Sequence, residues 1–94
     1  MGGIELEQVL KALGDPVRLS VVKQLLESKD EERACGTFDY TVTKATFSHH
    51  LAILREAGLI KSRFVGTTKL TSLRTRELKK HFPGLLEMIQ KSGR

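Results

Sequence analysis

The sequence predicts a single domain that is mainly α-helical and carries one small β-hairpin. Apolar residues recur at intervals of three or four over most of the chain, which is the spacing of one helix face. In the second half, two short runs rich in β-branched residues flank a glycine, a pattern typical of a hairpin. The 94 residues contain no repeat or linker, so residues 1–94 are expected to fold as one domain.

Two helices are predicted in the first quarter of the chain. Residues 4–13 form the first, because their apolar side chains share one helical face. Those side chains are Ile4, Leu6, Val9, Leu10 and Leu13. Gly14 ends this helix, and Asp15 and Pro16 begin the second as N-cap and first helical residue. The apolar residues between 17 and 26 give the second helix a broad buried face.

The third helix carries the most informative pattern. Thr43 is a good N-cap before residues 44–57. The residues that share the inward face of this helix are Phe47, Leu51 and Leu54. Gly58 stands where a left-handed residue ends a helix, and Leu59 follows as its hydrophobic partner.

The connection before the third helix is less regular. Residues 28–33 are expected to form a charged loop, because no apolar period runs through them. Residues 34–41 are interpreted as a link with one short helical turn around Phe38 and Tyr40. We therefore expect no strand before the hairpin.

The hairpin and two short helices complete the predicted fold. Residues 60–65 and 69–73 form its strands, and Gly66 supplies the turn. Residues 75–82 return to helix, Pro83 interrupts it, and the apolar residues after Pro83 continue as a last helical stretch.

Positive charge is concentrated in the second half of the chain. Residues 1–43 have a net charge of −3, whereas residues 44–80 carry nine Lys and Arg against two acids, a net charge of +7. A basic block in an otherwise balanced small domain is typical of a nucleic-acid binder. A solvated face that serves only solubility is the alternative interpretation.

The third helix and the hairpin together suggest duplex DNA as the partner. A helix with small polar side chains at its leading end can present them to base edges in the major groove, while a hairpin contacts the flanking DNA. The candidates for base contacts are Thr46, Ser48 and His49. The candidates for phosphate contacts are Lys44, Arg55, Lys61, Arg63 and Lys69.

Two stretches of the chain resemble the ArsR/SmtB family of repressors. Residues 48–59 contain Ser-x-His-Leu, three further residues and Arg-Glu-Ala-Gly-Leu, which is similar to the recognition-helix signature of that family. Residues 10–19 are similar to its opening run, and the hairpin with Gly66 falls where the family carries its wing. The resemblance implies a winged helix-turn-helix fold and a dimeric repressor on a pseudo-palindromic operator, released by an effector.

The resemblance also implies where two subunits would meet. In that family the first and last helices form the dimer interface, and pairing would help a chain too short to bury much surface alone. Carried over, the interface residues are Ile4, Leu6, Val9, Leu10, Leu85, Leu86, Met88 and Ile89. A two-fold dimer would place its recognition helices about 34 Å apart, one turn of DNA.

The sequence departs from the family at its metal sites. Arsenic-type sensors carry a Cys-x-Cys pair where this chain has the single thiol Cys35. Zinc-type sensors use carboxylate and His ligands on the terminal helix, and Glu77 and His81 have that spacing, but solvated polar residues explain it better. We therefore predict no metal cofactor and leave the effector open. Cys35 is either a redox switch or an inert buried thiol.

Other polar residues have competing interpretations. His50 is expected to pack against the preceding helix, whereas His49 projects from a different face. Arg18 either reaches a phosphate or is an ordinary solvated charge. The basic residues of the terminal helix are expected to be its solvated face: Arg74, Arg76, Lys79 and Lys80.

Several function classes are disfavoured. The chain has no Gly-rich phosphate loop, and Ser48 and His49 are adjacent rather than three or four residues apart, so catalysis is not expected. No apolar run is long enough to span a membrane and the start lacks signal-peptide features, so we expect a cytoplasmic protein. A winged-helix module that binds a protein or RNA partner remains the alternative.

Overall fold

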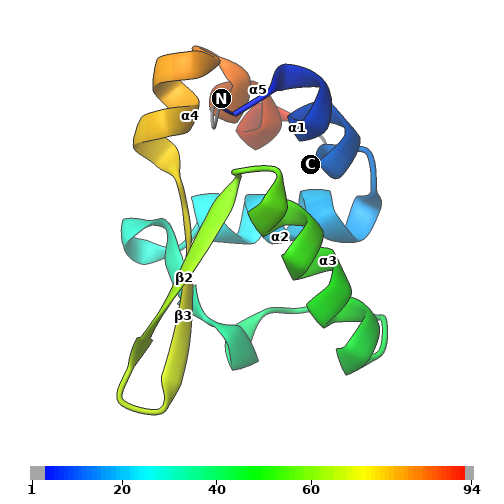
Figure 1. The fold of residues 1–94 in the computed structure, drawn as a ribbon, viewed down its shortest axis with the longest axis vertical. Helices are drawn as coiled ribbons and strands as arrows, with labels where there is room; N and C mark the ends of the chain where they lie inside the picture. The colour runs from blue at the N-terminus through cyan, green and yellow to red at the C-terminus, as the bar shows by residue number, and fades with distance from the viewer. Residues whose placement is uncertain (1–3, 93–94) are drawn as a thin grey trace.

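The computed structural model describes residues 4–92, which form five α-helices and a three-stranded antiparallel sheet (Figure 1). The elements are α1 (Leu6–Leu13), α2 (Pro16–Leu26), a 3-10 turn (Lys29–Glu31), β1 (Glu32–Ala34), a second 3-10 turn (Cys35–Thr37), α3 (Lys44–Glu56), β2 (Ile60–Val65), β3 (Thr68–Leu73), α4 (Thr75–His81) and α5 (Leu85–Lys91). This order confirms the predicted mainly helical domain with a hairpin. Within residues 4–92 no helix is long and apolar enough to cross a membrane.

The junction of α1 and α2 forms as the sequence predicts. α1 ends at Leu13, and the Asp15 carboxylate accepts hydrogen bonds from the N–H groups of Val17 at 2.8 Å and Arg18 at 3.3 Å. These bonds satisfy N–H groups that have no partner inside the helix, and Pro16 needs none. Asp15 and Pro16 therefore determine the sharp turn between α1 and α2.

Residues 28–33 are not the charged loop expected from the sequence. Lys29–Glu31 form a 3-10 turn, and Glu32–Ala34 form the edge strand β1, which pairs antiparallel with β3. The register places Arg33 opposite Thr71, 38 positions later in the chain. Such a short charged strand has no alternating apolar pattern, and only pairing with β3 makes it a strand.

The helical turn in the next segment lies earlier than predicted. It covers Cys35–Thr37, whereas Phe38 is extended and buried. Tyr40 stacks on Phe47 of α3, with 3.8 Å between ring centroids and 8° between ring planes. The two aromatic side chains thus pack on α3 instead of forming a local turn, because burying an aromatic ring is worth more than one helical turn.

Hydrogen bonds to α2 hold the same segment in place. The Gln24 amide donates to the Asp39 carbonyl at 2.8 Å and accepts from the Asp39 N–H at 2.9 Å. Arg33 donates to the side-chain oxygen Oε1 of Gln24 at 3.2 Å and to the backbone carbonyl of Thr37 at 3.0 Å. The leading end of α3 is therefore anchored, although residues 38–43 contain no helix.

The end of α3 confirms the predicted cap. Gly58 has φ 87°, its N–H donates to the Arg55 carbonyl, and the Leu59 N–H donates to the Leu54 carbonyl, both at 3.1 Å. This pair of bonds is the Schellman arrangement. A Cβ at Gly58 would lie 2.9 Å from Ile4 Cγ1, so the close approach of the first segment also requires glycine.

The hairpin has two distinct faces. β2 and β3 pair from Ile60 with Leu73 to Val65 with Thr68, and Gly66 at φ 63° begins the two-residue turn. Opposite residues share a face. The inner face, turned to the core, carries Ile60, Ser62, Phe64, Lys69, Thr71 and Leu73; the outer face carries Lys61, Arg63, Val65, Thr68, Leu70 and Ser72.

The core fills the space between the helices and the inner face of the hairpin. Its fully buried large side chains are Val9, Val21, Val22, Leu25, Leu54, Leu59, Ile60 and Leu78. Figure 1 shows α1, α4 and α5 at one end of the molecule, which we call the helical end. The hairpin tip and the leading end of α3 lie at the other, the hairpin end.

The eight residues expected between subunits do not share one exposed surface. Four are already buried within one chain: Val9, Leu85, Leu86 and Ile89. These four contribute to the core of one chain, because an apolar helix face looks the same whether it covers its own core or a partner, and their place in an interface stays a prediction. Ile4 is half-buried over Gly58, while Leu6, Leu10 and Met88 are 51%, 51% and 62% exposed.

Candidate nucleic-acid interface

The exposed face of α3 is lined by small side chains. Ala45, Ser48 and Ala52 follow one another at helical spacing, and Arg55 lies on the same strip, seven residues after Ser48. Ala45, Ser48 and Arg55 are exposed, and Ala52 is half-buried. His49 is exposed at the margin of this strip. With only a methyl or hydroxymethyl group along its centre, the helix can come close to a flat surface such as base edges.

The leading end of α3 exposes hydrogen-bonding groups. Thr43 accepts a hydrogen bond from the Thr46 N–H at 3.1 Å, and its hydroxyl donates to Thr46 Oγ1 at 2.9 Å. The Thr46 hydroxyl therefore keeps its own proton for another acceptor. Lys44 is exposed beside them, and the N–H groups of the first turn favour a negatively charged ligand.

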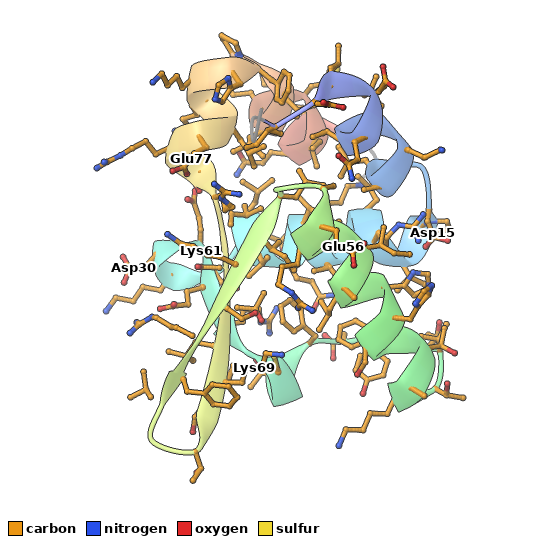
Figure 2. All side chains as sticks on the ribbon, in the orientation of Figure 1. Asp15, Asp30, Glu56, Lys61, Lys69 and Glu77 are labelled. Carbon is orange, nitrogen blue, oxygen red and sulfur yellow. The ribbon has the colours of Figure 1, made fainter. Side chains whose placement is uncertain are left out.

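The candidate cations of the hairpin lie on opposite faces. Lys69 is on the inner face, and Figure 2 shows its side chain on the side of the hairpin that faces α3. Lys61 and Arg63 are on the outer face, so the structure does not bring them to the side of α3. The hairpin thus separates three residues that the sequence grouped together.

Arg63 already has a partner on that outer face. Its guanidinium donates two hydrogen bonds to the Glu32 carboxylate of β1, at 3.1 and 3.2 Å. The hydrogen bond from Arg63 lowers the pKa of Glu32 below its usual value of 4.5. A phosphate would have to compete with this carboxylate for the guanidinium.

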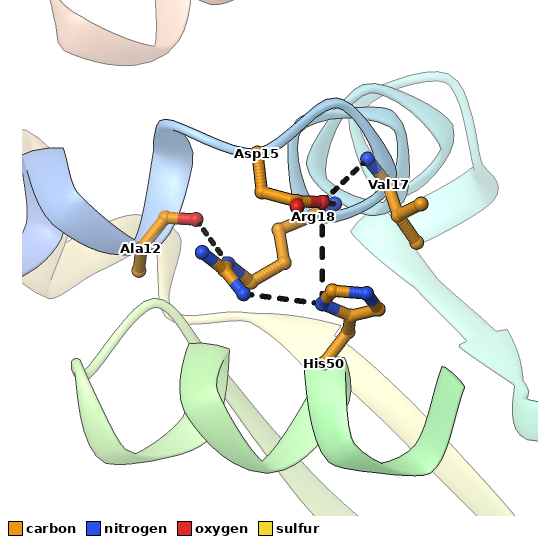
Figure 3. A network of polar contacts seen from close by, with 5 residues as sticks. All are labelled: Ala12, Asp15, Val17, Arg18 and His50. Carbon is orange, nitrogen blue, oxygen red and sulfur yellow. Dashed lines mark hydrogen bonds and ion pairs between the residues drawn. The ribbon is translucent and has the colours of Figure 1, made fainter. Parts of the chain in front are cut away.

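A polar network ties α1 and α2 to α3 (Figure 3). Arg18 donates from Nε to the Ala12 carbonyl at 2.6 Å and from a terminal nitrogen to His50 Nδ1 at 3.1 Å. Because a guanidinium only donates, Nδ1 accepts and the ring proton lies on Nε2. His50 packs against α2 as expected, whereas Arg18 is half-buried and hydrogen-bonded within the fold rather than an ordinary solvated charge.

Asp15 completes this network. Its Oδ1 lies 4.0 Å from His50 Nδ1. Burial raises the pKa of the Asp15 carboxyl, but the N–H groups of Arg18 and Val17 outweigh it and hold the pKa below 3.8. The carboxylate that begins α2 therefore stays charged beside the imidazole of α3.

The basic side chains between residues 44 and 80 do not form one continuous surface. Arg76, Lys79 and Lys80 are exposed on α4, at the helical end, away from the hairpin tip. This arrangement fits the expectation of a solvated helix face for these three residues, whereas Arg74, the N-cap of α4, is half-buried. The charge that surrounds α3 comes from Lys44, Arg55 and Lys69.

The remaining candidates lie apart from this surface. Cys35 is half-buried, with its Sγ 3.2 Å from Thr71 Oγ1, and neither interpretation of the thiol is tested. Glu77 is half-buried and His81 exposed on α4. Among residues 4–92, no three His, Cys, Asp or Glu side chains lie close enough together to hold a metal ion.

Sequence reasoning missed three residues at the hairpin end of the molecule. Tyr40 was assigned to a turn, although an aromatic residue close to Phe47 could have suggested stacking. Ala45 has no polar group and gave no signal as part of the exposed strip. Phe64 stands in a strand of alternating character, yet it is 68% exposed, which the pattern did not indicate.

Comparison with known proteins identifies related chains. A family model described as a helix-turn-helix domain matches residues 13–63. The HTH-type transcriptional regulator YceK of Bacillus subtilis is 38% identical over 84 residues, covering 87% of this chain and 83% of the relative. The transcriptional repressor SdpR of the same organism is 30% identical over 86 residues, covering 92% and 94%.

Solved structures share the fold. The ArsR family transcriptional regulator RHA00566 matches with a TM-score of 0.70 at 19% identity, covering 88% of this chain and 90% of that chain. NolR from Sinorhizobium fredii matches with a TM-score of 0.66 at 24% identity, covering 89% and 83%. At these identities the likeness concerns the fold.

Proposed function

The chain belongs to the winged helix-turn-helix transcriptional regulators of ArsR type, and we propose that it is a repressor that binds a pseudo-palindromic DNA operator as a homodimer. The observation that carries this proposal is the exposed strip of α3. Its small side chains run from the capped leading end to Arg55, with cations near both ends. A major groove accepts a helix of this shape.

Base edges and phosphates have separate partners in this proposal. Ser48 and His49 contact base edges, and Thr46 donates its hydroxyl proton to an acceptor in the groove or on the backbone. The cations near α3 contact phosphates: Lys44, Arg55 and Lys69. Lys61 and Arg63 are left out of the contact set because they lie on the outer face of the hairpin.

The homodimer rests on the apolar residues left exposed at the helical end. Leu6 and Leu10 are four residues apart on α1, and Met88 lies on α5 at the same end of the molecule. Large exposed apolar side chains that gather at one place favour an interface. A second copy related by a two-fold axis would cover them and present two α3 helices to the same side of a duplex.

The relatives, rather than the geometry of the site, support the role of a repressor. SdpR is a transcriptional repressor, and the match covers nearly all of both chains.

Selection of random duplex DNA on the purified protein, at physiological salt and under reducing conditions, tests the proposal. We expect a two-fold symmetric motif whose half-sites are separated by one helical turn, or a multiple of it. Binding that is independent of sequence, or that favours single-stranded RNA over duplex DNA, would contradict it. The winged-helix module with a protein or RNA partner would then replace the repressor.

A further inference from the structure

A small groove lies between the start of α2 and the segment that leads into α3. Its lining consists of Pro16, Val17 and Ser20 of α2 and of Asp39, Tyr40 and Thr41 of that segment. Its volume is about 430 Å³, within the range of sites that hold small molecules. Since the lining combines aliphatic and aromatic side chains with a few polar groups, the groove can hold a small molecule that is partly apolar.

The charge of this lining is not compensated within the groove. Asp39 is exposed and is the only charged residue among the six described residues that line it. The side chain of Gln24 fixes Asp39 through the backbone N–H at 2.9 Å and the backbone carbonyl at 2.8 Å. Because these bonds use backbone groups, they leave the carboxylate available. The groove therefore favours a ligand with a positive charge.

Tyr40 adds a second group that attracts a cation. Phe47 covers one face of its ring, with 3.8 Å between ring centroids, and Tyr40 is still 38% exposed. The uncovered part of the ring is available to a ligand. An aromatic ring attracts positive charge through its negative face, and organic ammonium ligands are recognised in this way. A carboxylate, an aromatic ring and an apolar wall together suit an organic cation that also has an apolar part.

A larger cavity between the sheet and α4 lacks this imbalance of charge. Its volume is about 640 Å³, and its described lining contains four acidic and four basic residues. Arg63 and Glu32 are paired there by two hydrogen bonds, and Thr75 donates a hydrogen bond to the Glu31 carboxylate. These charges are balanced by their neighbours in the fold, so the cavity shows no preference for the charge of a ligand.

We propose that the groove between α2 and residues 39–41 binds a small organic cation, with the positive charge at Asp39 and the apolar part against Tyr40 and Val17. A phosphate of DNA is a poorer occupant, because the described lining offers no cation and Asp39 would repel it. The volume also suits a small molecule better than a helix or strand of another protein.

A cation in this groove would also act on the proposed DNA contact. Asp39 lies five residues before Lys44, which stands at the leading end of α3 and is proposed to contact a phosphate. Neutralising the carboxylate would reduce its repulsion of the DNA backbone, so the bound cation should tighten operator binding. This step rests on the proposed function. By linkage, the operator should raise the affinity for the cation by the same factor.

The fluorescence of Tyr40 tests the groove directly. The chain has one tyrosine and no tryptophan, so the emission of Tyr40 reports on the groove without a label. Titration of the DNA-free protein with benzyltrimethylammonium chloride should change this emission saturably, with a Kd of about 1 mM or lower. Phenylacetate, which has the same ring and a negative charge, should leave the emission unchanged. Sodium chloride at equal concentration is the control for ionic strength.

Two matched substitutions separate the site from the net charge of the protein. Asp39→Asn should weaken binding of benzyltrimethylammonium about ten-fold, because the ion pair with the ligand is lost. Asp30→Asn removes the same charge on the other side of the hairpin from α3 (Figure 2), and it should bind the probe within two-fold of the wild type. Both residues are exposed, so neither substitution should disturb the fold.

Operator affinity tests the effect of the cation on DNA binding. With the groove saturated by benzyltrimethylammonium, the wild type should bind its operator about three-fold more tightly than in matched sodium chloride, as expected for one exposed charge. Asp39→Asn should bind the operator as tightly as the saturated wild type and should not respond to the probe. Asp30→Asn should respond as the wild type does.

The outcomes distinguish this inference from the proposed function. If the emission of Tyr40 shows no saturation with the cation, or changes equally with phenylacetate, the inference is overturned. It is also overturned if Asp39→Asn binds the cation as well as the wild type does. If the cation binds at Asp39 but operator affinity is unchanged, the effect on DNA binding is disproved. If the wild type binds no duplex at all, the proposed function fails, whereas the titration of Tyr40 still decides whether the groove binds the cation.

Discussion

The two ends of the molecule expose opposite chemistry. At the hairpin end, α3 exposes hydroxyl groups, an imidazole and cations along a strip of small side chains. At the helical end, α1 and α5 expose Leu6, Leu10 and Met88. The first surface suits a wet, negatively charged partner, and the second suits an apolar one. We therefore propose the first surface for DNA and the second for another copy of the chain.

The two ends are also connected physically. Arg18 donates to the last turn of α1 through Ala12 and to α3 through His50. A rigid link of this kind would let the dimer contact define the angle at which α3 meets DNA.

Leu10→Asp should have the largest effect. A carboxylate in an apolar interface is expensive to desolvate, so the dimer should dissociate. Loss of the second half-site should weaken operator binding by on the order of 100-fold, because the linked contact disappears. Sedimentation velocity and DNA titration measure both quantities. Gln8→Asp, exposed on another face of α1, is the control; equal effects of the two variants would remove this face from the interface.

His49→Ala should cost about 1–3 kcal/mol of binding free energy on the operator, as expected for a base contact. Binding to unrelated duplexes should be unchanged, and the selected motif should relax at one position in each half-site. Competition titrations with single-base operator variants measure this. An unaltered preference at every position would exclude His49 from base contact.

Arg18→Gln should destabilise the fold by about 1–3 kcal/mol, because two hydrogen bonds from a charged donor are lost. Urea unfolding measures the difference, with Lys11→Gln on the exposed face of α1 as the control. In this variant the affinity between subunits and the affinity for DNA should also both fall, each independently of the other. A stability equal to the wild type would mean that the Arg18 network does not join the two ends.

The faces of the hairpin can be compared through salt dependence. Lys69→Ala should lower the slope of log affinity against log salt by about one. Arg63→Ala should leave that slope nearly unchanged, because Arg63 lies on the outer face and holds Glu32. If Arg63→Ala also lowers the slope by one, both faces of the hairpin contact DNA.

The smallest expected effect concerns acid stability. The folded-state pKa of Glu32 lies below its usual value of 4.5, so its pairing with Arg63 stabilises the fold above that pH. The stabilisation is lost as the pH falls through the lower, folded-state pKa. Glu32→Gln should therefore reduce the melting temperature at pH 6 but not near pH 2. A difference that persists at pH 2 would show that the ion pair is not its cause.

Local signals in the sequence were sufficient for most helix boundaries. Asp15, Thr43 and Gly58 each act on N–H or carbonyl groups within five residues, so their caps can be predicted from neighbouring letters. The amphipathic pattern of α3 likewise depends only on helical spacing, and it identified the candidate face for DNA. The hairpin followed from Gly66 between two β-branched runs.

The order of the helices, their caps, the hairpin and the exposed face of α3 could therefore be predicted from local sequence. The tertiary structure alone decided that Glu32–Ala34 form a strand, that Tyr40 stacks on Phe47, and that Arg18 joins three helices. It also decided which apolar residues remain exposed for a partner. The reason is physical: caps and helix faces depend on atoms a few residues apart, whereas strand pairing and burial depend on residues that meet only when the chain has folded.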